Sequence, residues 1–542
     1  MGIWHERKVN MNFLLLLCAI VILVCVFFGR FSSKVGVPAL LLFMLIGMMF
    51  GSDGIFRINF EDYQLTERVC SIALIFIMFY GGFCVKWEAA KPVIGKAVMM
   101  STLGVILTAG ITCVLCHFVL RVDWAESFLI GAVISSTDAA SVFSILRSKN
   151  LSLKNATAPL LEIESGSNDP IAYMLTMIGL ALIQGNAQNS IPYMIFAQIV
   201  FGVLFGLGVA IAAIWLMRKF SIEAENLDMI FMIGIALLAY ALPALTGGNG
   251  YLSVYMAGII LGNSKMKNKA VLVHFFDGIT GLAQICLFFL LGLLAFPHKL
   301  PQVLVPAIII AVILNFIARP ASVMAILMPF RASLRQCALV SFAGLRGAAS
   351  IVFAIMVIAQ GVTLENDLFH IVFLVSLFSV ALQGSLLPMV ARKLDMVDND
   401  SDIRKTFNDY QEETAITLLR MYIHEGHNWE NRMIKDVSLP SNSLAVMIKR
   451  DGETLIPKGD TKILAGDNLI LNVPYYNADN EVKLQEIAID KNHSWCDKKI
   501  MELDLSQNTL VTMIRRAEET IIPDGQTTIR NKDIVVVCEQ EV

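Results

Sequence analysis

Residues 161–171 read Leu-Glu-Ile-Glu-Ser-Gly-Ser-Asn-Asp-Pro-Ile, within a segment, 156–184, that is otherwise largely apolar. A segment of this length can cross a lipid bilayer as a helix. Ionisable side chains inside such a helix are costly, so they indicate a functional site that faces the interior of a bundle. Pro170 also removes a backbone hydrogen bond beside the acid at position 169. The stretch predicts a membrane protein with a functional carboxylate inside its helical bundle.

The composition of the whole chain agrees with this prediction. Of the 542 residues, 56% are hydrophobic and 16% are charged, and the mean hydropathy is +0.66. A soluble domain usually carries about 25% charged residues. The charges are unevenly spread, with 41 in residues 1–390 and 46 in residues 391–542. We therefore expect a polytopic membrane domain followed by a soluble region. The net charge of −3, without a basic stripe, gives no reason to expect a nucleic-acid partner.

Thirteen apolar segments in residues 1–390 are candidate spans of an all-α domain in the lipid bilayer. With the C-terminus in the cytoplasm and the N-terminus outside, cytoplasmic loops hold 17 basic residues and outer loops 6, as the positive-inside rule requires. We expect a multi-pass protein of the cell (inner) membrane. The candidate spans are 11–29, 35–51, 66–83, 93–119, 125–147, 156–184, 192–217, 226–246, 250–263, 272–296, 301–328, 334–359 and 367–390.

Three further spans carry polar or charged residues. Span five contains Ser135-Ser-Thr-Asp-Ala-Ala-Ser141, span eleven contains Asn315-Phe-Ile-Ala-Arg-Pro320, and span twelve contains Gly344-Leu-Arg-Gly-Ala-Ala-Ser350. Ser, Thr and Asp compete for backbone hydrogen bonds. We therefore expect spans five and twelve to be broken helices that line a cavity, where free carbonyls can bind a cation. The similar sequences around positions 138 and 347, seven spans apart, predict an inverted repeat.

These buried charges have a structural alternative, because ion pairs can exist inside a bundle without any role in transport. The alternative stays open for Glu164 with one arginine. It is weaker for Asp138 and Asp169, since Arg319 and Arg346 are too few to neutralise all the acids. We favour transport.

The motifs that end in Asp138 and Asp169, together with Arg319-Pro and Gly-Leu-Arg346-Gly, resemble those of the NhaP-type cation/proton antiporters, relatives of the eukaryotic sodium/proton exchangers. The resemblance covers about residues 10–390. It implies a homodimer of 13-span protomers, each with a dimerisation domain and a mobile core domain. It also implies exchange of a monovalent cation, K⁺ or Na⁺, for H⁺ by alternating access.

The same resemblance implies roles for individual residues. Asp169 would carry the cation and the proton in turn, and Asp138, Ser165 and the backbone of Thr137 would be further cation ligands. Asn168, in place of a second Asp, implies electroneutral exchange of one cation for one proton.

Two points of the resemblance stay open. Glu164 is similar to a buried acid that pairs with an arginine, and either Arg319 or Arg346 is available here. Many relatives also have an acid before the Gly-Gly of span three, where this chain has Phe79-Tyr-Gly-Gly82. A sodium assignment is therefore not transferred.

The soluble region contains an internal repeat. At an offset of 66 residues and without a gap, Glu453-Thr-Leu-Ile-Pro-Lys-Gly459 aligns with Glu519-Thr-Ile-Ile-Pro-Asp-Gly525. Each unit is expected to be α+β, with short strands and one short helix around 431–437 or 497–503. The expected boundaries are a membrane domain at 1–390, a linker at 391–412, and modules at 413–475 and 476–542.

Both modules resemble the RCK-C (TrkA-C) regulatory module of potassium-transport proteins. The resemblance implies control by dimerisation or by a small-molecule regulator, which in some members is cyclic di-AMP; a structural cap is an equal alternative. No G-x-G-x-x-G precedes the modules, so control by NAD or ATP is not expected. Cys113-Val-Leu-Cys116-His117 matches a haem-attachment pattern but lies in an apolar run without room for haem, and we expect no cofactor.

Our interpretation is thus a secondary transporter, not an enzyme, that exchanges K⁺ or Na⁺ for H⁺. The RCK-C modules favour K⁺. The alternatives are a Na⁺-specific antiporter, or an organic-anion or amino-acid transporter with TrkA-C modules. A channel is disfavoured because no Thr-Val-Gly-Tyr-Gly filter occurs, and common hydrolase motifs are absent from the sequence.

Overall fold

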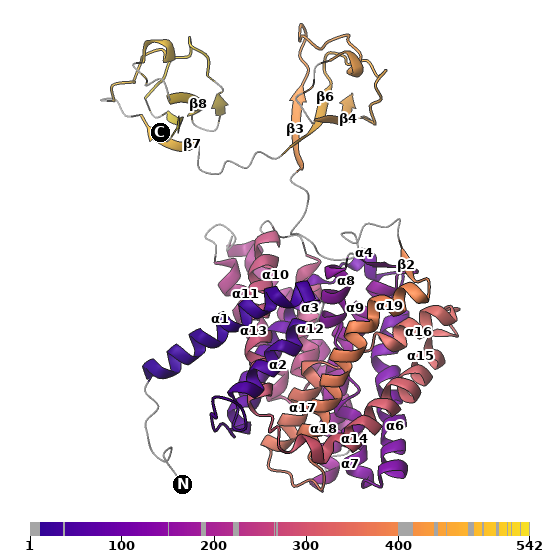
Figure 1. Cartoon of the computed structure of the whole chain (residues 1–542). Helices are drawn as coiled ribbons and strands as arrows, with labels where there is room; N and C mark the ends of the chain where they lie inside the picture. Colours follow the sequence, from indigo (N-terminus) through magenta and orange to yellow (C-terminus); the bar gives the residue numbers. More distant parts are fainter. Residues whose placement is uncertain are drawn as a thin grey trace. The chain divides into compact units, whose positions relative to one another are not determined.

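The computed structural model divides into two compact units, Met1–Glu412 and Glu413–Val542. The first is helical and the second consists of strands (Figure 1). The structure describes residues 11–35, 38–149, 151–185, 191–220, 227–264, 266, 269–398, 416–437, 439, 443–450, 453–474, 482–489, 493–503, 505, 509–516, 519–521, 523–531 and 533–540.

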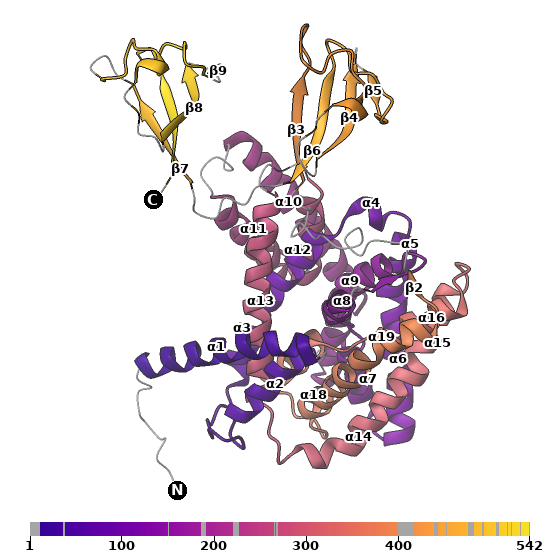
Figure 2. The same ribbon diagram turned by 45° about the horizontal axis from the view of Figure 1, so that its top comes forward.

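The helical unit follows the order of the predicted apolar segments. Seven helical stretches among the described residues are long and apolar enough to cross a membrane. Figure 2 shows α9 surrounded by other helices of the unit. The helices are α1 (Met11–Val35), α2 (Ala39–Phe50), α3 (Tyr63–Cys84), α4 (Trp87–Ala90), α5 (Ile94–Met99), α6 (Val105–Leu115), α7 (Trp124–Val133), α8 (Ala139–Ser148), α9 (Thr157–Ile183), α10 (Ile191–Phe220), α11 (Asp228–Leu245), α12 (Gly250–Gly262), α13 (Lys269–Leu293), α14 (Leu300–Val312), α15 (Arg319–Leu327), α16 (Leu334–Phe342), α17 (Ala348–Ala359), α18 (Leu368–Phe378) and α19 (Ser385–Lys393).

Several long helices contain π-helical turns. These turns occupy Met100–Gly104 between α5 and α6, Cys116–Leu120 after α6, Ile313–Ala318 between α14 and α15, and Ser379–Gly384 between α18 and α19. A π-helical turn inserts an extra residue and shifts the faces of the helix that follows, and such turns are frequent near functional sites. One of them directly precedes the buried Arg319, and another begins at Ser379, whose hydroxyl binds the amide of the buried Arg346.

Small residues let the helices approach closely. A Cβ on Gly82 of α3 would lie 2.4 Å from the carbonyl oxygen of Tyr255 on α12. A Cβ on Gly258 of α12 would lie 2.5 Å from the carbonyl oxygen of Phe79 on α3. Backbone contact through small residues is how helices gain packing energy in lipid, where no hydrophobic effect drives them together. α3 and α12 therefore form a rigid pair.

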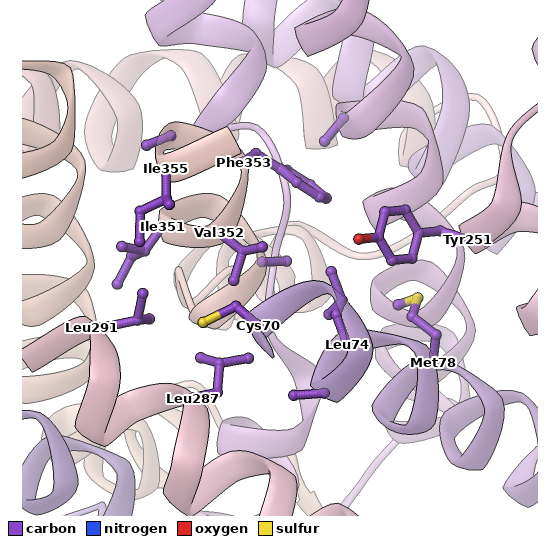
Figure 3. Close-up of a cluster of buried hydrophobic side chains, with 14 of the residues drawn as sticks. Cys70, Leu74, Met78, Tyr251, Leu287, Leu291, Ile351, Val352, Phe353 and Ile355 are labelled. Carbon is purple, nitrogen blue, oxygen red and sulfur yellow. The ribbon is translucent and has the colours of Figure 1, made fainter. Parts of the chain in front are cut away.

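Figure 3 shows the apolar core around α3. Cys70, Leu74 and Met78 of α3 face Leu287 and Leu291 of α13, Tyr251 of α12 and several side chains of α17. All the labelled side chains are buried. This core joins α3, α12, α13 and α17 into one packed body.

The predicted breaks in spans five and twelve are present. Residues 134–138 separate α7 from α8, and residues 343–347 separate α16 from α17, and neither stretch is helical. The two unwound stretches meet, because the Asp138 amide donates to the carbonyl of Leu345 at 2.8 Å. The stretches 134–138 and 343–347, which are distant in the sequence, therefore lie side by side.

The second unit contains two four-stranded antiparallel sheets with separate cores. Their strand orders, β3-β6-β4-β5 and β7-β10-β8-β9, are equivalent after a shift of four strands, as expected for a duplication. The expected short helices are single 3₁₀ turns at Ile434–Asp436 and Ile500–Glu502. The strands are β3 (Ile416–Tyr422), β4 (Leu444–Arg450), β5 (Glu453–Leu455), β6 (Asn468–Pro474), β7 (Val482–Ala488), β8 (Thr509–Arg516), β9 (Glu519–Ile521) and β10 (Ile534–Gln540).

The expected linker, 391–412, begins inside the helical unit. Its first residues complete α19, and β2 (Val397–Asp398) pairs with β1 (Ser152–Leu153) from the loop between α8 and α9. Lys154 of that loop also forms an ion pair with Asp395, with Nζ and Oδ1 2.9 Å apart. Residues 399–412 of the linker lie outside the described residues.

Candidate functional site

The charged motif at 161–171 lies on α9, which continues as a helix through Pro170. The carbonyl group of Pro170 accepts a hydrogen bond of 2.7 Å from Nδ2 of Asn249, whose Oδ1 caps the first turn of α12. The start of α12 is therefore bound to α9 one residue beyond Asp169.

Asp169 is buried and faces the unwound stretch between α7 and α8. Its Oδ1 accepts a hydrogen bond from the hydroxyl of Ser136. One turn earlier on α9, Ser165 donates to the carbonyl of Thr137 at 2.6 Å. Asn168, directly before Asp169, donates from Nδ2 to the Thr137 hydroxyl at 2.5 Å. The side chains of α9 thus dock directly on the backbone and hydroxyls of the broken span.

Asp138 lies at the end of the same unwound stretch and opens α8. Its Oδ1 accepts from the Ser141 backbone amide at 3.3 Å, as an N-terminal capping acid does, and its Oδ2 accepts from the Ser141 hydroxyl at 2.5 Å. A Cβ on Gly347 would lie 2.4 Å from Asp138 Oδ2, so the second unwound stretch packs tightly against this carboxylate. The structure therefore brings Asp138, Thr137, Ser165 and Asp169 to one region.

Glu164 pairs with Arg319, the first residue of α15 after the π-helical turn at 313–318. Arg319 Nη2 and Glu164 Oε1 are 2.6 Å apart, and the two side chains are 2% and 1% exposed. The sequence leaves the choice between two arginines open, and this contact resolves it. The pair is held away from Asp169 because Glu164 and Asp169 lie on different faces of α9.

Arg346 has a different set of partners. Its Nη1 donates to the carbonyls of Ser135 and Ser136, at 2.7 and 2.6 Å. Its own amide donates to the hydroxyl of Ser379, where the last π-helical turn begins. The unwound end of α7 leaves carbonyls without helical partners, and the guanidinium of Arg346 satisfies two of them.

The arrangement is suited to a hard, monovalent cation. Its oxygen atoms come from carboxylates, hydroxyls and free carbonyls, which are the ligands that alkali cations prefer. Across the described part of the chain, no cluster of three or more His, Cys, Asp or Glu side chains suits a metal ion. In the Phe79-Tyr-Gly-Gly82 stretch of α3, Phe79 is fully buried.

Three residues near the site are not among the predicted site residues. Ser136 lies in the polar run 135–141, two residues before Asp138, so the run itself indicates it as a candidate. Asn249 lies in the Thr-Gly-Gly-Asn-Gly stretch between two apolar segments, which is a turn signal. Tyr255 belongs to an apolar helix with no signal at all.

Comparison with known proteins agrees with this geometry. Residues 19–393 match the family described as "Sodium/hydrogen exchanger, transmembrane", and residues 418–473 and 484–540 each match the TrkA-C domain. A solved structure of the sodium proton antiporter MjNhaP1 from Methanocaldococcus jannaschii at pH 8 is similar, with a TM-score of 0.61 at 22% identity. The match covers 69% of this chain and 97% of that one.

Two similar proteins extend over most of the chain. The K(+)/H(+) antiporter NhaP of Alkalimonas amylolytica is 31% identical over 85% of this chain and 81% of its own length. The K(+)/H(+) antiporter NhaP2 of Shewanella sp. (strain ANA-3) is 32% identical over 85% of this chain and 81% of its own length. The probable Na(+)/H(+) antiporter 2 of Methanocaldococcus jannaschii is 24% identical over 55% of this chain. The chain therefore belongs to the sodium/hydrogen exchanger family, and it is a cation/proton antiporter rather than an enzyme.

Proposed function

We propose that this antiporter exchanges K⁺ for H⁺, one for one, by alternating access. The choice of K⁺ over Na⁺ rests on the two relatives named K(+)/H(+) antiporters, whose similarity extends into the tail modules. The relative named as a probable Na(+)/H(+) antiporter matches a smaller part of the chain.

The observation that carries the mechanism is the position of Asp169. The carboxylate is buried among the helices, and the described residues offer it a hydroxyl partner, Ser136, but no arginine or lysine. A buried carboxylate without a fixed cation must be neutralised. A proton or a transported cation can do this, but one carboxylate cannot hold both. The two ions are then carried in opposite directions across the membrane.

The neighbouring residues have supporting roles. Asp138, Thr137 and Ser165 supply further oxygen ligands, while Asn168 keeps the site from gaining a second titrating acid on α9. Glu164 and Arg319 form a fixed structural ion pair, and Arg346 holds the unwound carbonyls in place. Only Asp169 then changes its partner during transport, which gives the ratio of one to one.

We propose the following architecture for the transport cycle. Thirteen spans form an inverted repeat within residues 1–390, and two protomers form a dimer in the inner membrane. The N-terminus lies outside and the tail lies in the cytoplasm. A linker at 391–412 leads to two regulatory modules, 413–475 and 476–542, which respond to a small molecule such as cyclic di-AMP.

Everted membrane vesicles provide the test. Adding KCl, NaCl or LiCl should release protons from vesicles with the wild-type protein, with the strongest response to K⁺. Asp169→Asn should abolish the response because an amide cannot exchange a proton for a cation. The control is Asp277→Asn, which changes an exposed acid of α13 that contacts Tyr80, and it should behave as the wild type. Retained exchange in Asp169→Asn would contradict the assignment.

The same assay decides between K⁺ and Na⁺. A response to Na⁺ alone would identify a Na⁺-specific antiporter. Removing residues 399–542 tests the tail, because this deletion keeps β2 and its pairing with β1. Activity and regulation that do not change on this deletion would leave the modules as a structural cap.

A further inference from the structure

Tyr255 of α12 has a hydroxyl group that is buried in the helical unit without a hydrogen-bond partner among the described residues. The residue is 2% exposed, and Oη is the one tyrosine hydroxyl among the 15 buried side-chain atoms of the described residues that lack a hydrogen-bond partner. A buried tyrosine hydroxyl usually finds a partner, because an unpaired polar group destabilises the fold. The unpaired oxygen therefore indicates a missing ligand.

The hydroxyl points to the part of α9 that carries the site. A Cβ on Gly166 would lie 2.6 Å from both Oη and Cε2 of Tyr255, so the phenol rests on a helix surface that has no side chain. Gly166 precedes Asp169 by three positions, and residues three apart are neighbours on a helix. The phenol is close enough to Glu162 and, with a smaller effect, to Asp169 to interact with both electrostatically. Oη thus lies against the face of α9 that also carries Asp169.

Close contacts hold the phenol in this position. Asn249 Nδ2 binds the carbonyl of Pro170, one turn of α9 away from Gly166. On the other side of α12, Gly82 of α3 allows backbone contact at the carbonyl of Tyr255 itself. The ring is therefore carried by a rigid helix pair, which is the arrangement that a binding site requires.

We propose that the hydroxyl of Tyr255 is a further ligand of the transported cation and contributes to its selection. The inference rests on the proposed role of Asp169 as the carrier. Ser136, Thr137 and Ser165 approach the cation from the broken span and from α9, and Tyr255 adds an oxygen from α12. A phenol oxygen is neutral at working pH, so it adds coordination without adding a charge. The competition between proton and cation stays at Asp169, and the exchange ratio does not change.

Tyr255→Phe removes the single oxygen atom and keeps the ring. Full-length protein is reconstituted in proteoliposomes, and proton movement is followed with a pH-sensitive dye while K⁺, Na⁺ and Li⁺ are titrated separately. Because a polar contact with a charged partner is lost, the KM for the preferred cation should rise about tenfold. Vmax should be largely kept, and the order of preference among the three cations should change.

Thermal unfolding supplies an independent readout. Without added cation, the Tm of Tyr255→Phe should equal or exceed that of the wild type, because the variant no longer buries an unpaired hydroxyl. The stabilisation that K⁺ gives to the wild type should be reduced. A role in packing alone would instead lower the Tm and leave the KM unchanged.

Two further variants sharpen the test. Tyr251→Phe removes a hydroxyl from the same helix, at a side chain that packs in the core of Figure 3 against Phe353, and its KM values should be those of the wild type. Gly166→Ala should displace the phenol ring and raise the KM as Tyr255→Phe does.

Asp169→Asn, measured in parallel, separates the two proposals. If Asp169→Asn still exchanges ions, the carrier assignment fails and the ligand role of Tyr255 fails with it. If Asp169→Asn is inactive and Tyr255→Phe has wild-type KM values for all three cations, only the inference about Tyr255 is overturned. A fall in Vmax with unchanged KM values would overturn it as well.

Discussion

Replacing Glu164 by glutamine should destabilise the helical unit strongly. The change leaves the guanidinium of Arg319, which is 2% exposed and 2.6 Å from the lost carboxylate oxygen, without a counter-charge. Breaking a buried ion pair in this way costs about 3–5 kcal/mol. Glu164 also interacts electrostatically with Arg346. Arg319 and Arg346 also repel each other, and the change removes the acid that attracts both, so we expect a value near the upper end of this range.

The prediction is tested by thermal unfolding of the purified protein in detergent. For a unit of this length, a loss of this size corresponds to a Tm lower by about 3–6 °C. The double variant Glu164→Gln/Arg319→Gln should recover much of the loss, because it removes the unpaired charge as well. The control is Lys154→Gln, which breaks an exposed ion pair with Asp395 and should leave the Tm unchanged.

Transport by the destabilised variant gives a second criterion. Below its melting temperature, Glu164→Gln should still exchange ions with a nearly normal KM, because Asp169 keeps its own contacts. A Tm within about 1 °C of the wild type would refute the electrostatic argument. A stable but inactive Glu164→Gln would instead place Glu164 in the ion path.

Two other predictions concern packing and the tail. Gly82→Ala should reduce the yield of folded protein, because the new Cβ would lie 2.4 Å from the Tyr255 carbonyl, whereas Gly81→Ala meets no atom within 4 Å and should be tolerated. Size-exclusion chromatography compares the two, and equal yields would contradict the packing argument. In the tail, burial raises the pKa of Asp467, but hydrogen bonds from Arg450 and the Leu464 amide outweigh it and hold the pKa below its usual value. Because the folded pKa is depressed, this stabilisation is present above the unfolded pKa and is lost as the pH falls through the folded pKa, below about pH 4. Urea unfolding of residues 413–542 between pH 3 and 7 should show this loss. Arg450→Met should lower the stability at pH 7 and reduce the dependence, part of which remains because the Leu464 amide still binds Asp467 and Arg516 still binds Asp533 in the second module.

Much of the site can be predicted from the sequence because charges are rare in apolar spans. Asp138, Glu164 and Asp169 stand out for this reason. The structure places Asp138 at the end of the unwound stretch before α8 and the other two acids on α9, whose side chains bind that stretch. The breaks themselves are predictable from the Ser, Thr and Gly residues that weaken a helix locally. The repeat in the tail is visible because both copies keep the same turn residues, and the structure gives them equivalent sheets.

The partners of the charges are harder to predict. Arg319 and Arg346 lie in similar polar motifs, and only the packing of α15 and of the unwound stretch decides that Arg319 meets Glu164. The π-helical turn before Arg319 determines on which face of the helix Arg319 lies, and no residue pattern predicts such a turn. Tyr255 is equally hard to predict. Its own helix is largely apolar, and the reason to consider its hydroxyl is the contact with Gly166 of α9, which is distant in the sequence.

Glu164 and Asp169 show why partners, rather than residue types, decide what a buried acid does. Both acids lie on α9, five positions apart, and both are buried. Glu164 has a guanidinium that is part of the chain, so its charge is neutralised permanently and it has no need of an ion from solution. Asp169 meets a neutral hydroxyl from Ser136, which can orient a carboxylate but cannot cancel its charge. In the mechanism that we propose, the missing half of that second pair comes from the two aqueous phases, as H⁺ on one occasion and as a metal cation on another. On this proposal, α9 carries both a fixed support at Glu164 and an exchangeable site at Asp169, and the difference lies in whether the chain itself supplies the counter-charge.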